Sequence, residues 1–251
     1  MRKMLYSSVA VSAFIFAATS ALASPHGSKG HWGYSGEVGP EHWASLEPAY
    51  EMCGKGVNQS PIDLTGFIEA ELEPIRFDYR GLATEIVNNG HAIQANYAAG
   101  STITVAGRTF ELKQFHFHAP SENTIDGKYF AMESHFVHAD ENGKLAVIAV
   151  MYVPGEANEG MAKLWKQMPK HPGDKEAMAS QVKAEDLLPT NREYYRFNGS
   201  LTTPPCTEGV LWLVMKNPVT VSKEQVKQFS DTMGFPNNRP VQPVGARPVL
   251  K

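Results

Sequence analysis

The sequence predicts a mainly β protein with peripheral helices, built as a single domain. Three observations support this prediction. Short runs rich in Val, Ile, Thr, Tyr and Phe follow one another through the middle of the chain, separated by glycine-containing turns. Only two segments show the periodicity of an amphipathic helix. No repeat, low-complexity tract or Pro/Ser-rich linker divides the chain after residue 40, so one domain is expected rather than two.

The predicted strands are separated by recognisable turns. Asp126-Gly127 and Asn142-Gly143 are hairpin signals, because these residues tolerate positive φ. The strands that each turn separates are therefore expected to be antiparallel neighbours. We expect strands at residues 85–87, 92–97, 102–105, 109–117, 129–138 and 145–153.

The two predicted helices follow these strands and are interpreted as scaffold. The first begins after an Asn158 cap and carries an apolar stripe of Met161, Leu164, Trp165 and Met168. The second spans residues 223–233, with a capping box formed by Ser222 and Gln225 and with Gly234 as a C-terminal stop.

The first residues of the chain resemble a secretory signal. Arg2 and Lys3 precede an apolar run that is too short to span a bilayer, and Ala21-Leu22-Ala23 is a suitable cleavage site. We therefore predict a cleaved signal peptide over residues 1–23 and a single mature domain over residues 24–251, in a periplasmic or secreted protein. A retained membrane anchor is the alternative. The net charge of −3 and the lack of a basic run argue against nucleic acid as a partner.

Cys53 and Cys206 are the two cysteines of the sequence. In an oxidising compartment an even number of cysteines indicates a disulfide, so these two are expected to pair. Two separate buried thiols are the alternative.

The most informative stretch is "QFHFHAPSE", residues 114–122, together with "MESHFVH", residues 132–138. Side chains alternate between the faces of a strand, so Gln114, His116 and His118 should share one face, opposite to Lys113, Phe115 and Phe117. His135 should lie on the neighbouring strand, with His138 on the other face. Three neutral imidazoles with no fourth protein ligand are typical of a catalytic zinc site that keeps one position open. Three unrelated semi-buried histidines are the alternative.

Two polar neighbours are suited to orient these ligands. Glu133 can accept the free ring N–H of His135, and the side-chain carbonyl of Gln114 can do the same for His116.

Eight short strings then occur in the order and spacing of a known family. They are HWGY from His31, GPEHW from Gly39, NQSPIDL from Asn58, NNGH from Asn88, the two histidine stretches above, SLTTPPCTEGVLW from Ser200 and NNRPVQP from Asn237. The chain resembles the α-class carbonic anhydrases over nearly its whole mature length. Exported members of this family are similar also in pairing cysteines at the places of Cys53 and Cys206.

This resemblance implies a large, twisted, mostly antiparallel sheet with a conical cleft, and Zn²⁺ bound by His116, His118 and His135. It implies reversible hydration of CO2 to bicarbonate by zinc-bound hydroxide, and inhibition by sulfonamides and anions. Glu122 and Thr202 would orient the hydroxide, and His91 would shuttle protons to solvent. Tyr34 and Asn89 would order water. The CO2 and bicarbonate pocket would be lined by Val137, Val147, Leu201, Thr203, Val210 and Trp212.

Three departures from the common pattern of the family change no ligand. Ala119 stands where Trp is frequent, Asn123 where His is frequent, and Gln94 where Asn is frequent. We expect them to alter packing or water order, and thus the rate, without abolishing activity.

Two other interpretations remain open from the sequence. His116-x-His118-x-x-x-Glu122 also fits the first motif of cupins, which bind iron or manganese, but the preceding glycine and the second motif are lacking. A non-catalytic binding module on the same fold is the second alternative, as in relatives that have lost a zinc histidine. The sequence leaves monomer and homodimer equally open, and no membrane partner is expected after signal cleavage.

Overall fold

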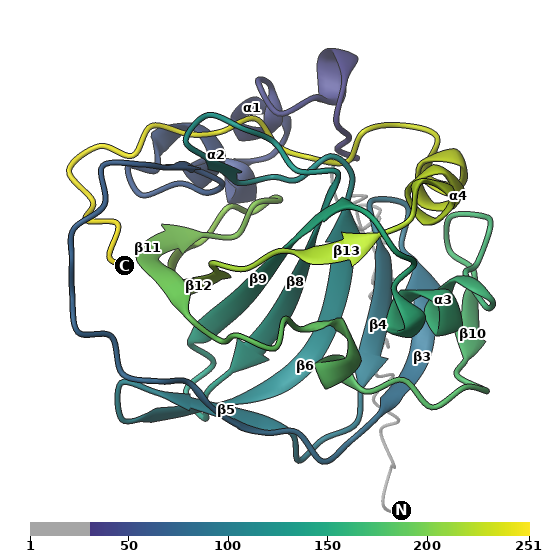
Figure 1. The fold of residues 1–251 in the computed structure, drawn as a ribbon. Coiled ribbons are helices and arrows are strands. Elements are labelled where there is room, and N and C mark those ends of the chain that lie inside the picture. Colours follow the sequence, from purple (N-terminus) through teal and green to yellow (C-terminus); the bar gives the residue numbers. More distant parts are fainter. Residues whose placement is uncertain (1–30) are drawn as a thin grey trace, which may run out of the picture. The chain divides into compact units, whose positions relative to one another are not determined.

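An eleven-stranded sheet forms the centre of the computed structural model, which describes residues 31–251 (Figure 1). Its strands are β2 (Arg76–Asp78), β3 (Ala83–Asn88), β4 (Ile93–Tyr97), β5 (Thr102–Val105), β6 (Arg108–His118), β8 (Met132–Ala139), β9 (Leu145–Pro154), β10 (Lys175–Ala177), β11 (Tyr194–Ser200), β12 (Glu208–Met215) and β13 (Val219–Val221). The main path is β10-β3-β4-β6-β8-β9-β12-β11. Neighbouring strands are antiparallel, except that β12 and β13 lie parallel to β9. The predicted mostly antiparallel sheet is confirmed.

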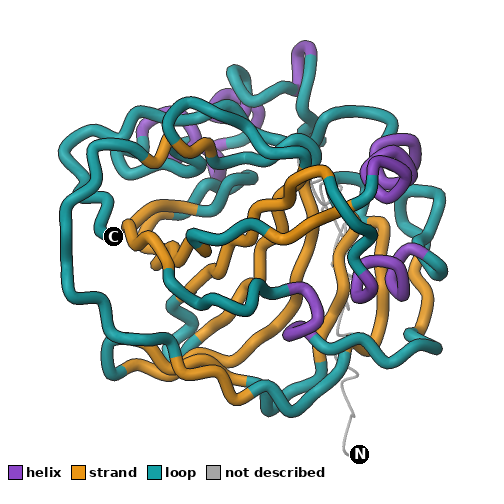
Figure 2. The backbone as a smooth tube through the Cα atoms, viewed as in Figure 1, coloured by secondary structure: helices purple, strands orange, loops and turns teal. Residues whose placement is uncertain are grey.

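Short elements surround this sheet, and Figure 2 shows helices beside it and one helical turn in front of its strands. β1 (Asp63–Leu64) and β7 (Thr124–Ile125) form a separate parallel pair. The helices are η1 (Gly36–Val38), α1 (Trp43–Leu46), η2 (Pro48–Tyr50), α2 (Met52–Lys55), α3 (Glu159–Trp165), η3 (Ala184–Leu187) and α4 (Lys223–Met233).

Both predicted helices are present with the expected caps. The side chain of Asn158 accepts the N–H of Met161 at 2.8 Å and begins α3. Helix α4 has the capping box of Ser222 and Gln225, and Gly234 ends it with φ of 74°, a conformation that other residues rarely adopt. Helix α3 is shorter than its apolar stripe, because Met168 lies beyond the last turn yet is buried in the same cluster.

The central hairpins differ slightly from the expectation. Strands β6 and β8 are antiparallel neighbours, as are β8 and β9. However, the turn at Asp126-Gly127 directly joins Ile125 to Lys128, and β8 begins only at Met132 rather than at Tyr129. A second difference is a shift of register between Leu112 and Gln114, which places Lys113 in a bulge. The expectation that Lys113 shares a face with Phe115 and Phe117 is therefore wrong.

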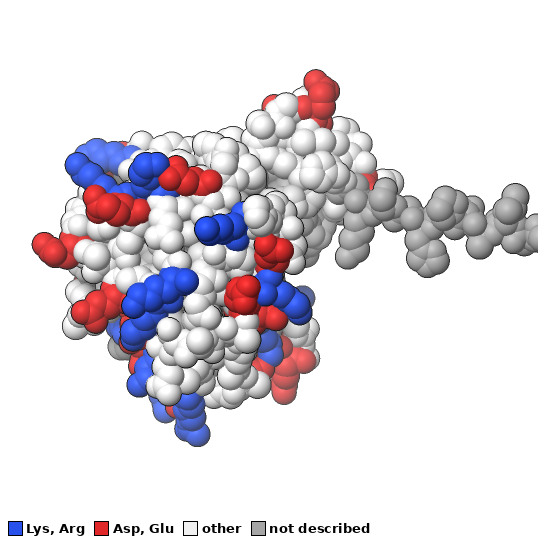
Figure 3. Space-filling model, turned by 90° about the vertical axis from the view of Figure 1, so that its right-hand side faces the viewer, with Lys and Arg blue, Asp and Glu red and all other residues white. Residues whose placement is uncertain are grey.

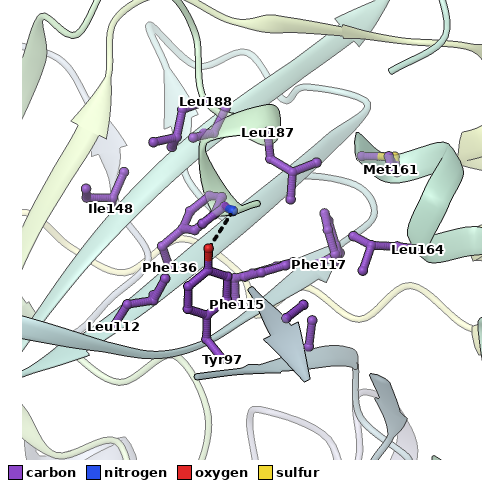
Figure 4. Close-up of a cluster of buried hydrophobic side chains, with 14 of the residues drawn as sticks. Tyr97, Leu112, Phe115, Phe117, Phe136, Ile148, Met161, Leu164, Leu187 and Leu188 are labelled. Atoms are coloured by element: carbon purple, nitrogen blue, oxygen red, sulfur yellow. Dashed lines mark hydrogen bonds between the residues drawn. The ribbon is translucent and has the colours of Figure 1, made fainter. Parts of the chain in front are cut away.

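Two apolar clusters pack on the sheet. The first includes Phe115, Phe117 and Phe136 and is covered by α3 and η3, as Figure 4 shows for Met161 and Leu164. The second includes Val147 and Trp212, among ten buried residues. Residues 146–152 of β9 are buried throughout, because this strand contributes to both clusters. The histidines of β6 and β8 are thus set into a sheet whose two faces are both packed.

The described residues form one compact unit, from His31 to Lys251. On the face drawn in Figure 3, basic and acidic side chains are interspersed. Within residues 31–251 none of the helices has the length and apolar character needed to cross a membrane. The predicted signal peptide, residues 1–23, lies outside the described residues.

Candidate metal centre

The three predicted metal ligands converge at the paired ends of β6 and β8. His116 lies directly opposite His135 in the antiparallel register, and His118 follows two residues later on the same face of β6. One ring nitrogen from each histidine lies within 4.8 Å of the other two. This is the spacing expected around a single metal ion.

The other ring nitrogen of each histidine is held by an acceptor. Nδ1 of His116 lies 2.9 Å from Oε1 of Gln114, and Nε2 of His135 lies 2.9 Å from Oε1 of Glu133, both as predicted. Nδ1 of His118 lies 2.7 Å from the backbone oxygen of Asn237, which the sequence did not reveal. These acceptors fix the tautomers, so Nε2 of His116, Nε2 of His118 and Nδ1 of His135 are free to bind a metal.

The electrostatics of this centre keep the three histidines neutral, which suits them to bind a cation. Burial, and next the neighbouring histidines, hold the pKa values of His116 and His135 well below the ordinary value, and burial lowers the pKa of His118. Neutral imidazole is the form that binds metal. Nε2 of His118 is buried and has no hydrogen-bond partner within residues 31–251. Three neutral imidazoles with free nitrogens therefore fit zinc.

Glu133 is surrounded by hydrogen-bond donors. Its Oε2 accepts the backbone N–H groups of Glu122 at 2.7 Å and Asn123 at 2.8 Å. Its Oε1 accepts the side-chain amide of Asn123 at 2.6 Å and the ring N–H of His135. Burial raises the pKa of Glu133 to about 7, but four donors require an acceptor-only carboxylate, so we assign the ionised form. The departure at Asn123 thus provides a donor to this carboxylate.

Glu122 is fully buried beneath the metal centre. Its Oε1 accepts the backbone N–H of Arg239 at 2.8 Å, and its Oε2 lies 3.5 Å from Nε2 of His118. Burial raises the pKa of Glu122 to about 8, while the Arg239 N–H and the Thr202 hydroxyl oppose this rise. The Thr202 hydroxyl thus lowers the pKa of Glu122, yet Oε2 of Glu122 makes no hydrogen bond of standard length within residues 31–251. A dication held by the three histidines would also oppose the rise in the pKa of Glu122.

The histidines line a cavity of about 190 Å³. Its wall combines polar and apolar side chains from distant parts of the chain. The lining residues are Trp32, Tyr34, Asn89, His91, Ala92, Gln94, Gln114, His116, His118, His135, Val137, Val147, Leu201, Thr202, Thr203 and Trp212. Of the residues predicted to line the substrate pocket, Val210 is the exception: it is buried in the second apolar cluster and is not among the lining residues.

His91 stands in the cavity wall, on the turn before β4. Its backbone N–H donates to Oδ1 of Asn89 at 2.9 Å, and its ring stacks on Trp32 with centroids 3.7 Å apart. Burial lowers its pKa, with a further contribution from His31. The partner Trp32 was not predicted, since nothing in the local sequence links it to His91.

The segment that carries Thr202 is tied to the rest of the protein at its far end. Cys206 forms the predicted disulfide with Cys53, and its N–H donates to the oxygen of Thr203 at 2.9 Å. The amide of Gln59 donates to the oxygen of Cys206 at 3.0 Å.

Tyr34 also lines the cavity that the histidines line. Burial, and next the nearby Glu122, raises the pKa of Tyr34 well above the ordinary value.

Three histidines that could hold one metal ion, beside a cavity lined by polar and apolar side chains on a β-sheet scaffold, are typical of a metalloenzyme. A family model described as eukaryotic-type carbonic anhydrase matches residues 38–251. The chain is 46% identical to a carbonic anhydrase of Pectobacterium atrosepticum, over 88% of this chain and 90% of the relative. It is also 46% identical to a carbonic anhydrase of Neisseria gonorrhoeae, over 94% of each.

A solved structure is similar as well. The α-carbonic anhydrase of Thermovibrio ammonificans, in complex with the inhibitor sulfanilamide, superposes with a TM-score of 0.88 at 50% identity, covering 89% of this chain and 100% of that one. The chain belongs to the eukaryotic-type, or α, carbonic anhydrase family and is an enzyme of that family.

Proposed function

We propose that the chain binds Zn²⁺ through His116, His118 and His135 and catalyses the reversible hydration of CO2 to bicarbonate and a proton. The observation that carries this proposal is the convergence of three free imidazole nitrogens within 4.8 Å, in the lining of a cavity that also contains apolar side chains. When bound, zinc supplies a Lewis acid that lowers the pKa of a coordinated water to about 7, a value established for carbonic anhydrases themselves.

The role of Glu122 and Thr202 is to give the site a fixed hydrogen-bond polarity. Oε1 of Glu122 is occupied by the Arg239 N–H, whereas the buried Oε2 has no hydrogen-bond partner within residues 31–251 and is assigned to accept the hydrogen of the Thr202 hydroxyl. With its own hydrogen engaged in this way, the Thr202 oxygen can only accept from a group in the cavity. The pair therefore selects a hydrogen-bearing nucleophile and orients its lone pair.

The cavity wall provides a place for an apolar substrate. Val137, Val147, Leu201 and Trp212 line it beside the histidines. CO2 is apolar and gains little from polar contacts, so these side chains suit it, and Thr203, which also lines the cavity, is assigned to hydrogen-bonding the charged product.

Proton transfer to solvent is assigned to His91. A histidine has an ordinary pKa near 6.5, so it can accept and release protons near neutral pH. His91 lines the same cavity as the three histidines and is partly exposed. Tyr34 and Asn89, also in the lining, are assigned to ordering the water between them.

The setting and inhibitors follow from the sequence and from one relative. The sulfanilamide complex of the Thermovibrio ammonificans protein supports a prediction that sulfonamides inhibit this enzyme. The signal-like N-terminus supports a periplasmic or secreted location. CO2 and bicarbonate are the proposed small-molecule partners.

Stopped-flow CO2 hydration with and without a strong zinc chelator tests this proposal. His116→Ala is expected to lose zinc and nearly all activity, whereas His91→Ala is expected to retain zinc and lose chiefly the buffer-sensitive step. Zinc loss in both variants alike would contradict the assigned roles. A zinc-loaded wild-type protein that binds sulfonamide without hydrating CO2 would favour the binding module instead.

A further inference from the structure

The motif NNRPVQP contains a side chain that the proposed chemistry does not use. Asn237 lies after α4 and is fully buried. Its backbone oxygen orients His118, as described above. Its side-chain amide makes three further hydrogen bonds, all to backbone groups near the metal centre.

These bonds occur where two strands stop pairing. The register of β4 and β6 ends at Gln94 and His116. Beyond that point, Nδ2 of Asn237 donates to the oxygen of Phe117 at 2.9 Å, and Oδ1 accepts the N–H of Ala119 at 3.0 Å. The amide thus takes the place of a missing β4 peptide group along this edge of β6, where unpaired buried polar groups would be costly.

The second hydrogen of the same amide bonds to the turn before β4. Nδ2 of Asn237 donates to the backbone oxygen of His91 at 3.1 Å. On the other side of that residue, the His91 N–H is held by Asn89. The His91 main chain is therefore fixed on both sides, and one of the two anchors is shared with the strand that bears His118.

We propose that Asn237 is a positioning residue that holds His91, through its backbone oxygen, at a set distance from the metal ligands on β6. Asn237 acts on proton transfer through His91 and does not touch substrate. A proton carrier must lie within reach of an ordered water chain, so a small displacement of His91 slows its step. This inference rests on the proposed function in that it assumes His91 to carry the proton.

The test compares Asn237→Ala with Asn238→Ala. Asn238 is the adjacent residue of the same type, and within residues 31–251 its side chain makes a single long hydrogen bond, 3.4 Å to the oxygen of Ser121. In weak buffer, Asn237→Ala is expected to lower kcat by about 10-fold, less than the loss that a full 1 Å misplacement can cause. Both kcat/KM and the zinc content should change little, because the backbone oxygen that orients His118 remains. Added imidazole buffer should restore kcat, and Asn238→Ala should behave like the wild type.

Two further measurements separate positioning from a general structural role. In a His91→Ala background, Asn237→Ala should lower the buffer-limited kcat no further, because both substitutions remove the same step. By NMR on the zinc-loaded protein, the ring protons of His91 should lose part of their ring-current shift from Trp32 in Asn237→Ala. Asn237→Ser, which retains one donor, should show smaller changes of the same kind and replaces Asn237→Ala if that variant does not fold.

An unchanged buffer-limited kcat in Asn237→Ala, or an equal decrease with and without His91, would overturn the inference. A wild-type protein that fails to hydrate CO2 would overturn the proposed function instead. In that case an unchanged His91 ring-current shift in Asn237→Ala would still refute the positioning, and a reduced one would support it.

Discussion

Replacing Glu133 by Gln tests how the second layer of hydrogen bonds controls the metal centre. The carboxylate accepts four N–H donors, two at each oxygen. Glutamine has one oxygen and one NH2 group. In either orientation, two donors must therefore face an NH2 group.

The less costly orientation keeps the glutamine oxygen on the two backbone donors, those of Glu122 and Asn123. Its NH2 group then points at Nε2 of His135. The histidine can accept from this group only by moving its own hydrogen to Nδ1, which is the atom that faces the metal. Asn123 cannot easily adapt by turning its amide, because its Oδ1 already accepts the N–H of Ile62 at 3.1 Å.

The expected cost follows from these bonds. Loss of a partner that orients a metal-binding histidine typically weakens metal binding by about 10–100-fold, or about 1.4–2.8 kcal/mol. In the metal-free protein, buried donors left facing an NH2 group should lower the free energy of unfolding by roughly 2 kcal/mol or more.

The assay is competition for zinc against a chelator of known affinity, together with urea unfolding of the metal-free protein. Glu111→Gln is the matched control, because Glu111 lies on β6 and accepts a backbone N–H from Gly100 at 2.8 Å, as Glu133 accepts backbone N–H groups, but Glu111 bonds to none of the three histidines. Zinc affinity within 2-fold of the wild type in Glu133→Gln, at unchanged stability, would refute this account of the tautomer, given the about 10-fold minimum expected.

The remaining predictions concern groups around this centre. Trp32→Ala should expose the ring of His91 and raise its pKa towards the ordinary value, read by NMR titration of that ring; an unchanged midpoint would contradict the stacking argument. Burial lowers the pKa of His138 from 6.5 to about 4, so the unfolded state binds a proton that the folded state does not, and stability should fall by about 3 kcal/mol as the pH falls from 6.5 to 4. His138→Gln should remove that part of the pH dependence in urea unfolding of the metal-free protein, and an identical pH dependence in both proteins would argue against a buried neutral histidine. Replacing Cys53 and Cys206 together by serine should lower the free energy of unfolding by roughly 5 kcal/mol, as expected for cross-linking residues 153 apart in sequence, and a loss under 1 kcal/mol in calorimetry would refute this.

Local periodicity was sufficient to predict that the three histidines lie together and to predict two of their three acceptors. Gln114 and Glu133 are each two residues from the histidine that they orient, so one strand face contains both partners. The third acceptor, Asn237, is 119 residues from His118. No local pattern connects such residues, although the family resemblance included the motif in which Asn237 occurs.

The errors in the fold have a similar origin. The bulge at Lys113 depends on how β6 pairs with its neighbour, and an alternating pattern alone does not reveal an inserted residue. The apolar stripe extends to Met168 although α3 ends at Trp165, because a side chain on the turn that follows a helix can join the same apolar cluster. The stacking of Trp32 on His91 likewise depends on tertiary packing between distant segments.

Zinc titration of the metal-free protein, with CO2 hydration followed by stopped flow at each addition, tests the central claim most directly. The account predicts that activity is absent without metal, rises linearly with added zinc and stops rising at one equivalent per chain. Full activity before zinc is added, or no CO2 hydration once one equivalent is bound, would contradict it.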